Sequence, residues 1–128
     1  MRIMGVGFRA TADVASLQDA MQRALLAGGS QKIDALVTES AKSREKVFRE
    51  FAQLLGVPGL GITKSDLEQM ITPTQSQRIQ DRLGTGSLAE AAALAAAGPD
   101  ARLVAARVVS GDGMATAAIA ESKGNPSP

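Results

Sequence analysis

The residues best suited to chemistry lie just before a helix that we expect from Ser87 to Ala97. The segment contains an arginine, two glycines and two hydroxyl side chains, and reads Arg82-Leu83-Gly84-Thr85-Gly86-Ser87. N–H groups at a helix start have no partner within the helix, and glycines let a ligand approach them closely. The pattern predicts that this segment binds a phosphate or a carboxylate, through Arg82, Gly84, Thr85, Gly86 and Ser87. The lysine and spacing of a P-loop are missing, so nucleotide hydrolysis is not supported.

An ordinary capped helix is the alternative for the same residues. Ser87 and Glu90 have the spacing of a capping box, in which each side chain accepts a hydrogen bond from the other residue's backbone. Sequence alone leaves both interpretations open.

A second candidate site is the motif Gly5-Val6-Gly7-Phe8-Arg9, at the end of an expected strand. Only half of a dinucleotide-binding fingerprint is present. Ligands of open α/β sheets bind beyond the carboxyl ends of strands, so Gly7, Arg9 and Thr11 are predicted to form an anion site there. Alternatively, the two glycines only allow another element to pack closely on the strand.

Two further positions are weaker candidates for ligand binding. Thr72 stands in the Thr72-Pro73-Thr74 loop, for which a helix stop followed by a new cap is the favoured alternative. Arg107 lies in the otherwise apolar stretch 102–109. A charge in such a strand needs a partner or must face a ligand.

Catalytic chemistry is restricted because the sequence contains neither histidine nor cysteine. Their absence excludes disulfides, thiol nucleophiles and thiolate metal sites, and removes the commonest zinc ligand and general base. Glu90, Glu39 and Asp112 remain as candidate bases, although Glu39 with Lys42 is also typical of a solvated loop. No nucleophile–base pair with suitable spacing is visible, so no catalytic residue is assigned and neither metal nor cofactor is expected.

Composition narrows the function further. Fourteen basic and thirteen acidic residues leave a formal charge of +1, and Phe8, Phe48 and Phe51 are the only aromatic residues. A nucleic-acid or membrane-surface binder would normally show a basic excess or aromatic platforms. The start of the chain has no signal-peptide pattern, and the apolar run 91–97 is too short to span a bilayer. We therefore expect a cytoplasmic protein.

The pattern of elements predicts one α/β domain over residues 1–121, followed by a disordered tail at 122–128. Strands are expected at 3–8, 35–38, 60–63, 102–109 and 114–120, the last two joined as a hairpin. Helices are expected after an N-cap at Ser16, at 43–55, briefly from 65, and at 87–97. Alternation of this kind predicts a three-layer α/β/α sandwich with a mixed, mainly parallel sheet.

Three segments together resemble one family. They are Gly5–Arg9, the central stretch containing Thr72-Pro73-Thr74-Gln75-Ser76 and Gly84-Thr85-Gly86-Ser87-Leu88-Ala89-Glu90, and the closing strand Met114-Ala115-Thr116-Ala117-Ala118-Ile119-Ala120. They are similar to CobE and the C-terminal domain of CbiG, proteins of cobalamin biosynthesis. The resemblance covers nearly the whole chain and is closer to the free-standing CobE members. Two positions depart from the family pattern: Arg107 replaces its common lysine, and Gln75 its proline.

The resemblance implies a role in corrin-ring synthesis and adds Thr116 to the predicted ligand-binding residues. Precorrin intermediates carry many carboxylates, which Arg9, Arg82 and Arg107 could bind together with the amides of Gly86 and Ser87. The leading hypothesis is binding or transfer of such an intermediate. CbiG itself resembles a lactone hydrolase, so hydrolysis of a precorrin lactone or C–C bond is a second hypothesis. A module that docks on another pathway enzyme is a third.

Overall fold

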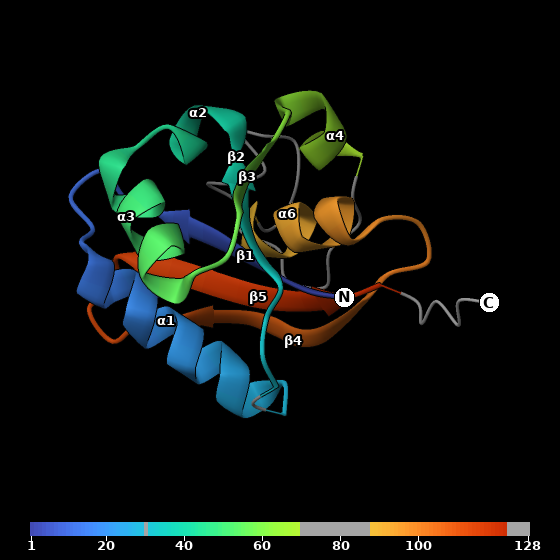
Figure 1. Ribbon diagram of the computed structural model, residues 1–128, viewed down its shortest axis with the longest axis horizontal. Coiled ribbons are helices and arrows are strands. Elements are labelled where there is room, and N and C mark those ends of the chain that lie inside the picture. Colours follow the sequence, from blue (N-terminus) through green and yellow to red (C-terminus); the bar gives the residue numbers. More distant parts are fainter. Residues whose placement is uncertain (30, 70–87, 123–128) are drawn as a thin grey trace.

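The computed structural model of the protein describes residues 1–29, 31–69 and 88–122, and its centre is a mixed β-sheet (Figure 1). Within these ranges the sheet has five strands in the order β3-β2-β1-β5-β4. Their bounds are β1 Arg2–Phe8, β2 Ala35–Glu39, β3 Gly59–Ile62, β4 Arg102–Val109 and β5 Ala115–Glu121. Strands β1, β2 and β3 are parallel, whereas β5 is antiparallel to both β1 and β4. The predicted mixed sheet with a C-terminal strand pair is confirmed.

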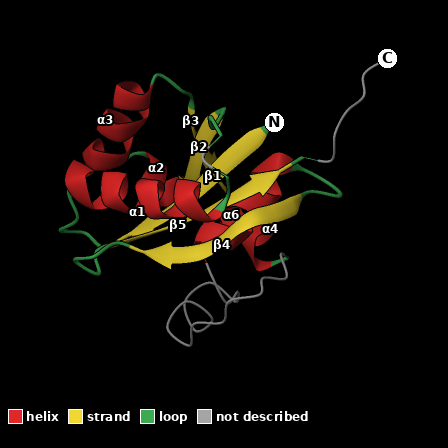
Figure 2. Cartoon of the chain, turned by 90° about the horizontal axis from the view of Figure 1, so that it is seen from below, coloured by secondary structure: helices red, strands yellow, loops and turns green. Residues whose placement is uncertain are grey.

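Helices cover both faces of this sheet. The helices of the described ranges are α1 Val14–Ala27, α2 Ser40–Ser43, α3 Lys46–Leu55, α4 Lys64–Glu68 and α6 Leu88–Ala97. Figure 2 shows α1 and α3 on one side of the sheet and α6 with α4 on the other. Helix α2 packs at the ends of β2 and β3. The arrangement is the predicted α/β/α sandwich. None of the helices in the described ranges is long and apolar enough to cross a membrane.

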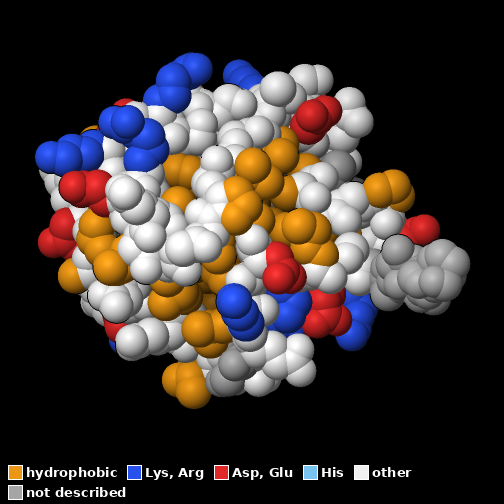
Figure 3. All heavy atoms as spheres, in the orientation of Figure 1, with side chains coloured by type: hydrophobic (Ala, Val, Ile, Leu, Met, Phe, Trp, Pro, Cys, Tyr) orange, Lys and Arg blue, Asp and Glu red, His pale blue; other side chains and the backbone are white. Residues whose placement is uncertain are grey.

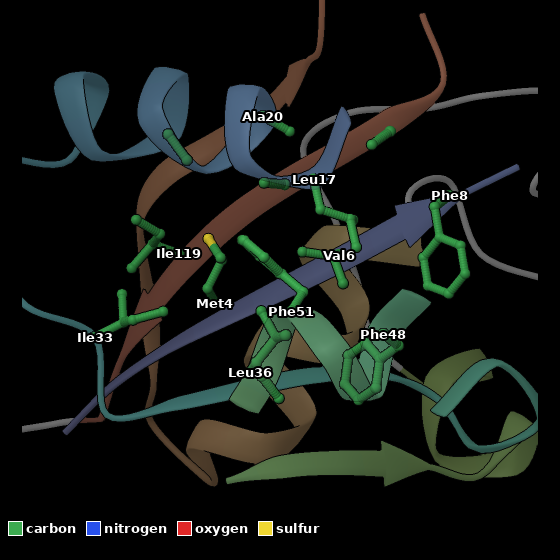
Figure 4. Packing of buried hydrophobic residues seen from close by; sticks show 14 of the residues in the cluster. Met4, Val6, Phe8, Leu17, Ala20, Ile33, Leu36, Phe48, Phe51 and Ile119 are labelled. Carbon is green, nitrogen blue, oxygen red and sulfur yellow. The ribbon is translucent and has the colours of Figure 1, made fainter. Parts of the chain in front are cut away.

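The larger hydrophobic core fills the space between the sheet and the α1–α3 layer. Met4, Val6 and Phe8 point from β1 into this core, because alternate side chains of a strand face the same side (Figure 4). Phe48 and Phe51 enter it from α3, and both are fully buried. The apolar stripe seen in the sequence thus forms the inner face of α3.

The smaller core, under α6, is built mainly from small residues. Ile3 of β1 contacts it, and Gly5 and Gly7 stand on the same side of that strand. A Cβ atom placed at Gly5 would lie 2.1 Å from the carbonyl oxygen of Ala89, within α6. Only glycine leaves room for this approach, so the close-packing interpretation of the Gly-x-Gly motif is confirmed for Gly5.

The start of α1 differs from the expected one. Asp13 is the N-cap, and its carboxylate accepts the Ser16 N–H at 2.9 Å, so the helix begins at Val14. Ser16, expected as the cap, occupies the third helical position and completes a capping box from the opposite side. Either residue can cap a helix by type, and the one whose backbone is extended takes the role.

Candidate functional site

The carboxyl end of β1 is where the opening motif meets solvent. Arg9 is exposed directly after the strand, and its N–H donates to the carbonyl of Met114 at 2.9 Å. Its side-chain Nε lies 3.4 Å from the carbonyl oxygen of Gly113, in the turn between β4 and β5. Thr11, also exposed, follows two residues later. Both predicted residues therefore lie at the edge of the sheet where ligands of α/β proteins bind.

Lys42 reaches the same edge from the neighbouring strand. It belongs to α2, which follows β2 directly, and its Nζ donates to the carbonyl oxygen of Phe8 at 3.0 Å. The ammonium also lies 4.9 Å from the centre of the Phe8 ring, and that ring stacks on Phe48 with their centres 6.4 Å apart. The sequence favoured a solvated loop over a catalytic pair for Glu39 and Lys42, because the reach of Lys42 to β1 depends on β2 being next to β1 in the sheet.

Figure 3 shows Lys and Arg side chains gathered at the end of the molecule that carries α2 and α3. The basic residues of these two helices and the turn between them are Lys42, Arg44, Lys46 and Arg49. A protein with a formal charge of +1 therefore has an end that favours anions, although Glu45 and Glu50 are interspersed there.

Gly7 and Thr116 lie side by side in paired strands. Thr116 Oγ1 donates to the carbonyl of Gly7 at 3.4 Å, and a Cβ atom at Gly7 would lie 2.9 Å from that hydroxyl oxygen. The side chain of Leu88, at the start of α6, covers the same glycine. These two predicted residues thus form a tight contact beside the first turn of α6. Their role toward a ligand stays a prediction.

Six of the predicted ligand-binding residues lie outside the described ranges. They are Thr72, Arg82, Gly84, Thr85, Gly86 and Ser87. The expected helix after this segment is present, and α6 begins at Leu88 beside Gly7.

Glu90, a candidate base, is fully buried in the first turn of α6. Its Oε2 accepts the backbone N–H of Arg107 at 2.9 Å. Between Ala105 and Val108 the pairing of β4 with β5 shifts register, so the N–H bound by Glu90 stands at an irregular point of the sheet. The carboxylate therefore provides a hydrogen-bond acceptor for the Arg107 N–H, which the irregular strand directs toward α6. Arg107 itself is half-buried on β4, which is separated from β1 by β5.

Asp112, the second candidate base, holds the turn between β4 and β5 against α1. Its carboxylate accepts hydrogen bonds from the hydroxyls of Ser110 and Ser16 and from the N–H of Met114. These bonds, the Ser110 hydroxyl first, lower the pKa of Asp112 to about 2. Asp19 of α1 accepts the Gly111 N–H at 2.6 Å in the same turn. Asp112 is thus an ionised structural residue.

Glu39, the third candidate base, is half-buried at the start of α2 with an extended backbone. Within the described ranges no group of carboxylates has the arrangement of a metal site. Among the described residues, Arg9 and Lys42 therefore provide positive charge at the carboxyl edge of the sheet. Two of the three candidate bases, Glu90 and Asp112, make structural hydrogen bonds.

A cavity of about 600 Å³ lies elsewhere, between α4 and the end of α6. Its lining residues are Asp66, Gln69, Leu94, Ala95, Gly98, Pro99, Asp100 and Ala101. Among these described residues two carry negative charge and none carries positive charge. The cavity is consequently a poor place for an anionic ligand, and it does not coincide with the cationic edge.

The chain is similar to proteins of cobalamin biosynthesis. The sequence model of the family described as "Cobalamin synthesis G C-terminus" matches residues 2–120. The crystal structure of CobE, described as a protein from the cobalamin (vitamin B12) biosynthetic pathway, superposes with a TM-score of 0.79 at 29% identity. The match covers 94% of this chain and 89% of CobE.

Two other solved structures are similar. Cobalamin biosynthesis protein ChiG from Agrobacterium tumefaciens is 35% identical, with a TM-score of 0.75 over 97% of this chain and 100% of that one. A putative cobalamin biosynthesis protein G homolog from Sulfolobus solfataricus shares the fold, with a TM-score of 0.70 at 18% identity. That match covers 97% of this chain and 37% of the homolog. No match was found among curated protein sequences.

Proposed function

The chain belongs to the Cobalamin synthesis G C-terminus family, and from that premise we propose that it binds a polycarboxylate corrin intermediate at the carboxyl edge of its sheet. The protein is a cobalamin biosynthesis protein by this membership and by its similarity to CobE and ChiG. The observation that carries the binding proposal is the exposed guanidinium of Arg9 at the end of β1.

Arg9 has the chemistry that a carboxylate ligand needs. Its guanidinium offers five N–H donors in a planar fork, which matches the two oxygens of a carboxylate. Among the described residues its side chain makes one long contact, to the Gly113 carbonyl at 3.4 Å, and takes part in none of the ion pairs. Most of its donors are therefore available to a ligand.

Binding or transfer is favoured over hydrolysis by the roles of the candidate bases. A general base must reach water or substrate within hydrogen-bond distance. Glu90 is buried and accepts the Arg107 N–H, and Asp112 is held by two hydroxyls and a backbone N–H. We therefore assign the protein no chemical step. We propose that it acts in the cytoplasm and passes its ligand to other enzymes of the pathway.

A titration tests the proposal. Cobyrinic acid, a corrin whose side chains end in free carboxylates, is added to the protein, and the absorbance of the corrin ring is recorded. Saturable binding with protein at tens of micromolar is expected. Arg9→Gln should weaken binding about tenfold, since hydrogen bonds to charged groups contribute about 1.5–3 kcal/mol.

The matched control is Arg102→Gln. Arg102 lies at the opposite end of the sheet, at the start of β4, and its side chain is 73% exposed. This variant should bind like the unmodified protein. A folded protein that produces no absorbance change with cobyrinic acid would refute the proposed function.

A further inference from the structure

Lys42 and the Met114 carbonyl bind the two sides of one peptide group. The carbonyl of Phe8 and the N–H of Arg9 belong to the same planar unit. Lys42 Nζ donates to that carbonyl at 3.0 Å, and the Met114 carbonyl accepts that N–H at 2.9 Å. Lys42 therefore approaches the end of β1 from α2, and the Arg9 side chain lies beside the β4–β5 turn, where its Nε is 3.4 Å from the Gly113 carbonyl oxygen.

Contacts within the fold fix the position of α2, and with it Lys42. Gly61 of β3 lets the helix approach so closely that a Cβ atom there would lie 2.9 Å from Ser40 Cα. Ser43 Oγ donates to the Ser40 carbonyl at 2.6 Å within the helix. Just before it, the buried Thr38 Oγ1 donates to the Val6 carbonyl at 2.8 Å and ties β2 to β1. The contact of α2 with β3 and the bond between β2 and β1 thus fix the backbone that places Lys42 beside Phe8.

The lysine ammonium keeps donors beyond the one that it uses. It has three N–H groups, of which one serves the Phe8 carbonyl while the Phe8 ring covers part of the group. The ion pairs among the described residues join Arg2 and Arg102 to Glu121 and Arg23 to Asp19, so Lys42 is in none of them. A contact to one carbonyl and one ring leaves its full charge without a described counterion.

We propose that Lys42 is a carboxylate-binding residue that acts with Arg9 to hold two carboxylates of one ligand. This inference rests on the proposed function and adds a second, fixed cation to the same edge. The arginine fork binds one carboxylate in two-point fashion, whereas the lysine is a point charge that accepts a second carboxylate in several orientations. A ligand with several acidic arms gains from both contacts, and a monocarboxylate gains from only one.

The test compares Lys42→Gln with Lys32→Gln, because Lys32 is an exposed lysine before β2, at the amino end of the sheet. Each protein is titrated with cobyrinic acid and with its methyl ester, at two or more salt concentrations. Lys42→Gln should weaken acid binding about tenfold, leave ester binding unchanged, and reduce the dependence of acid binding on salt. Lys32→Gln should change none of these.

The outcomes separate the inference from the proposed function. If the unmodified protein does not bind the acid, the proposed function fails. If it binds and Lys42→Gln binds equally well, the inference alone is overturned. An equal loss for acid and ester would also overturn it, since that pattern belongs to a lysine that only positions β1.

A measurement on the unmodified protein covers the case in which Lys42→Gln does not fold. Lysines are acetylated with a small excess of acetic anhydride, and the rate at each lysine is followed by mass spectrometry. Saturating cobyrinic acid should slow the reaction of Lys42 several-fold and leave Lys32 unchanged. A rate at Lys42 that the acid does not change would overturn the inference.

Discussion

The two faces of the sheet are packed by different means. On the α1–α3 face, large side chains such as Phe48 and Phe51 keep the helices away from the strands. On the α6 face the backbones nearly touch, and the distance from a Cβ at Gly5 to the Ala89 oxygen would be 2.1 Å. The first face is therefore vulnerable to lost volume and the second to added volume.

Removing volume from the α1–α3 face should have the largest effect. Phe51 is fully buried, and Phe51→Ala is expected to lower the free energy of unfolding by about 4 kcal/mol through lost burial and a residual cavity. Urea unfolding followed by far-UV circular dichroism measures it, since the chain has no Trp or Tyr. Leu54→Ala on the same helix is the control; Leu54 is 63% exposed, and a change of less than about 0.5 kcal/mol is expected. Equal losses in both variants would contradict the assignment of the buried face.

Adding a single methyl group tests the α6 face. Gly5→Ala is expected to cost about 3 kcal/mol, because the new Cβ would meet backbone atoms of α6 that cannot move alone. Gly7→Ala should cost less, about 1 kcal/mol, since its new Cβ would meet the side chains of Thr116 and Leu88, which can move more easily than backbone. The same urea experiment ranks the two. If Gly5→Ala were as stable as the unmodified protein, the close approach of α6 to β1 would be wrong.

Removing the buried carboxylate of Glu90, in the first turn of α6, should have a smaller effect than Gly5→Ala. Glu90→Ala leaves the Arg107 N–H without its acceptor, and the expected loss is about 2 kcal/mol. Glu90→Gln retains a carbonyl oxygen for this donor and should lose less than Glu90→Ala. Hydrogen exchange at the Arg107 amide provides a local measurement: it should accelerate in the alanine variant. Unchanged exchange there would show that Glu90 does not hold the strand.

Acid should weaken the contact between the β4–β5 turn and α1, and this gives the smallest effect. The pKa of Asp112 lies at about 2 in the folded protein, below its ordinary value, so the native state resists protonation of this carboxyl. The stability that it contributes is present above about pH 4 and is lost as the pH falls toward 2. Urea midpoints at pH 6 and pH 3 should differ less in Asp112→Asn than in the unmodified protein. An identical pH response in both proteins would exclude this contribution.

The fold was largely predictable because its elements carry local signals. Alternation of apolar residues and the Ser110–Gly113 turn specify the strands and the C-terminal pair, and Gly56 ends α3 with the positive φ of 72° expected of a terminal glycine. The start of α1 was misplaced by three residues. Asp13 and Ser16 are both good caps by type, and the hydrogen bond from Ser16 to Asp112 that accompanies the observed choice joins residues far apart in sequence.

The candidate site was only partly predictable, since it depends on strand order. The position of Arg9 follows from the strand that precedes it. Lys42 can reach Phe8 only because β2 lies beside β1 in the sheet. Glu90 meets the Arg107 N–H because the register of β4 is irregular at that point. A single sequence specifies neither the order of the strands nor the register of β4. Spacing alone therefore favoured a helix cap for Glu90 and a solvated loop for Lys42.

The pairing of β1 with β5 has a consequence for how the protein is made. Arg2 pairs with Glu121, and their side chains join at 2.9 Å across a separation of 119 residues. A contact so distant in sequence closes late and is typical of slow folding. On the ribosome β1 emerges before β5, so one of its edges stays unpaired until β5 has been synthesised. We expect the nascent chain to depend on chaperones during that interval, because β1 is completed by the last of the five strands that the structure describes.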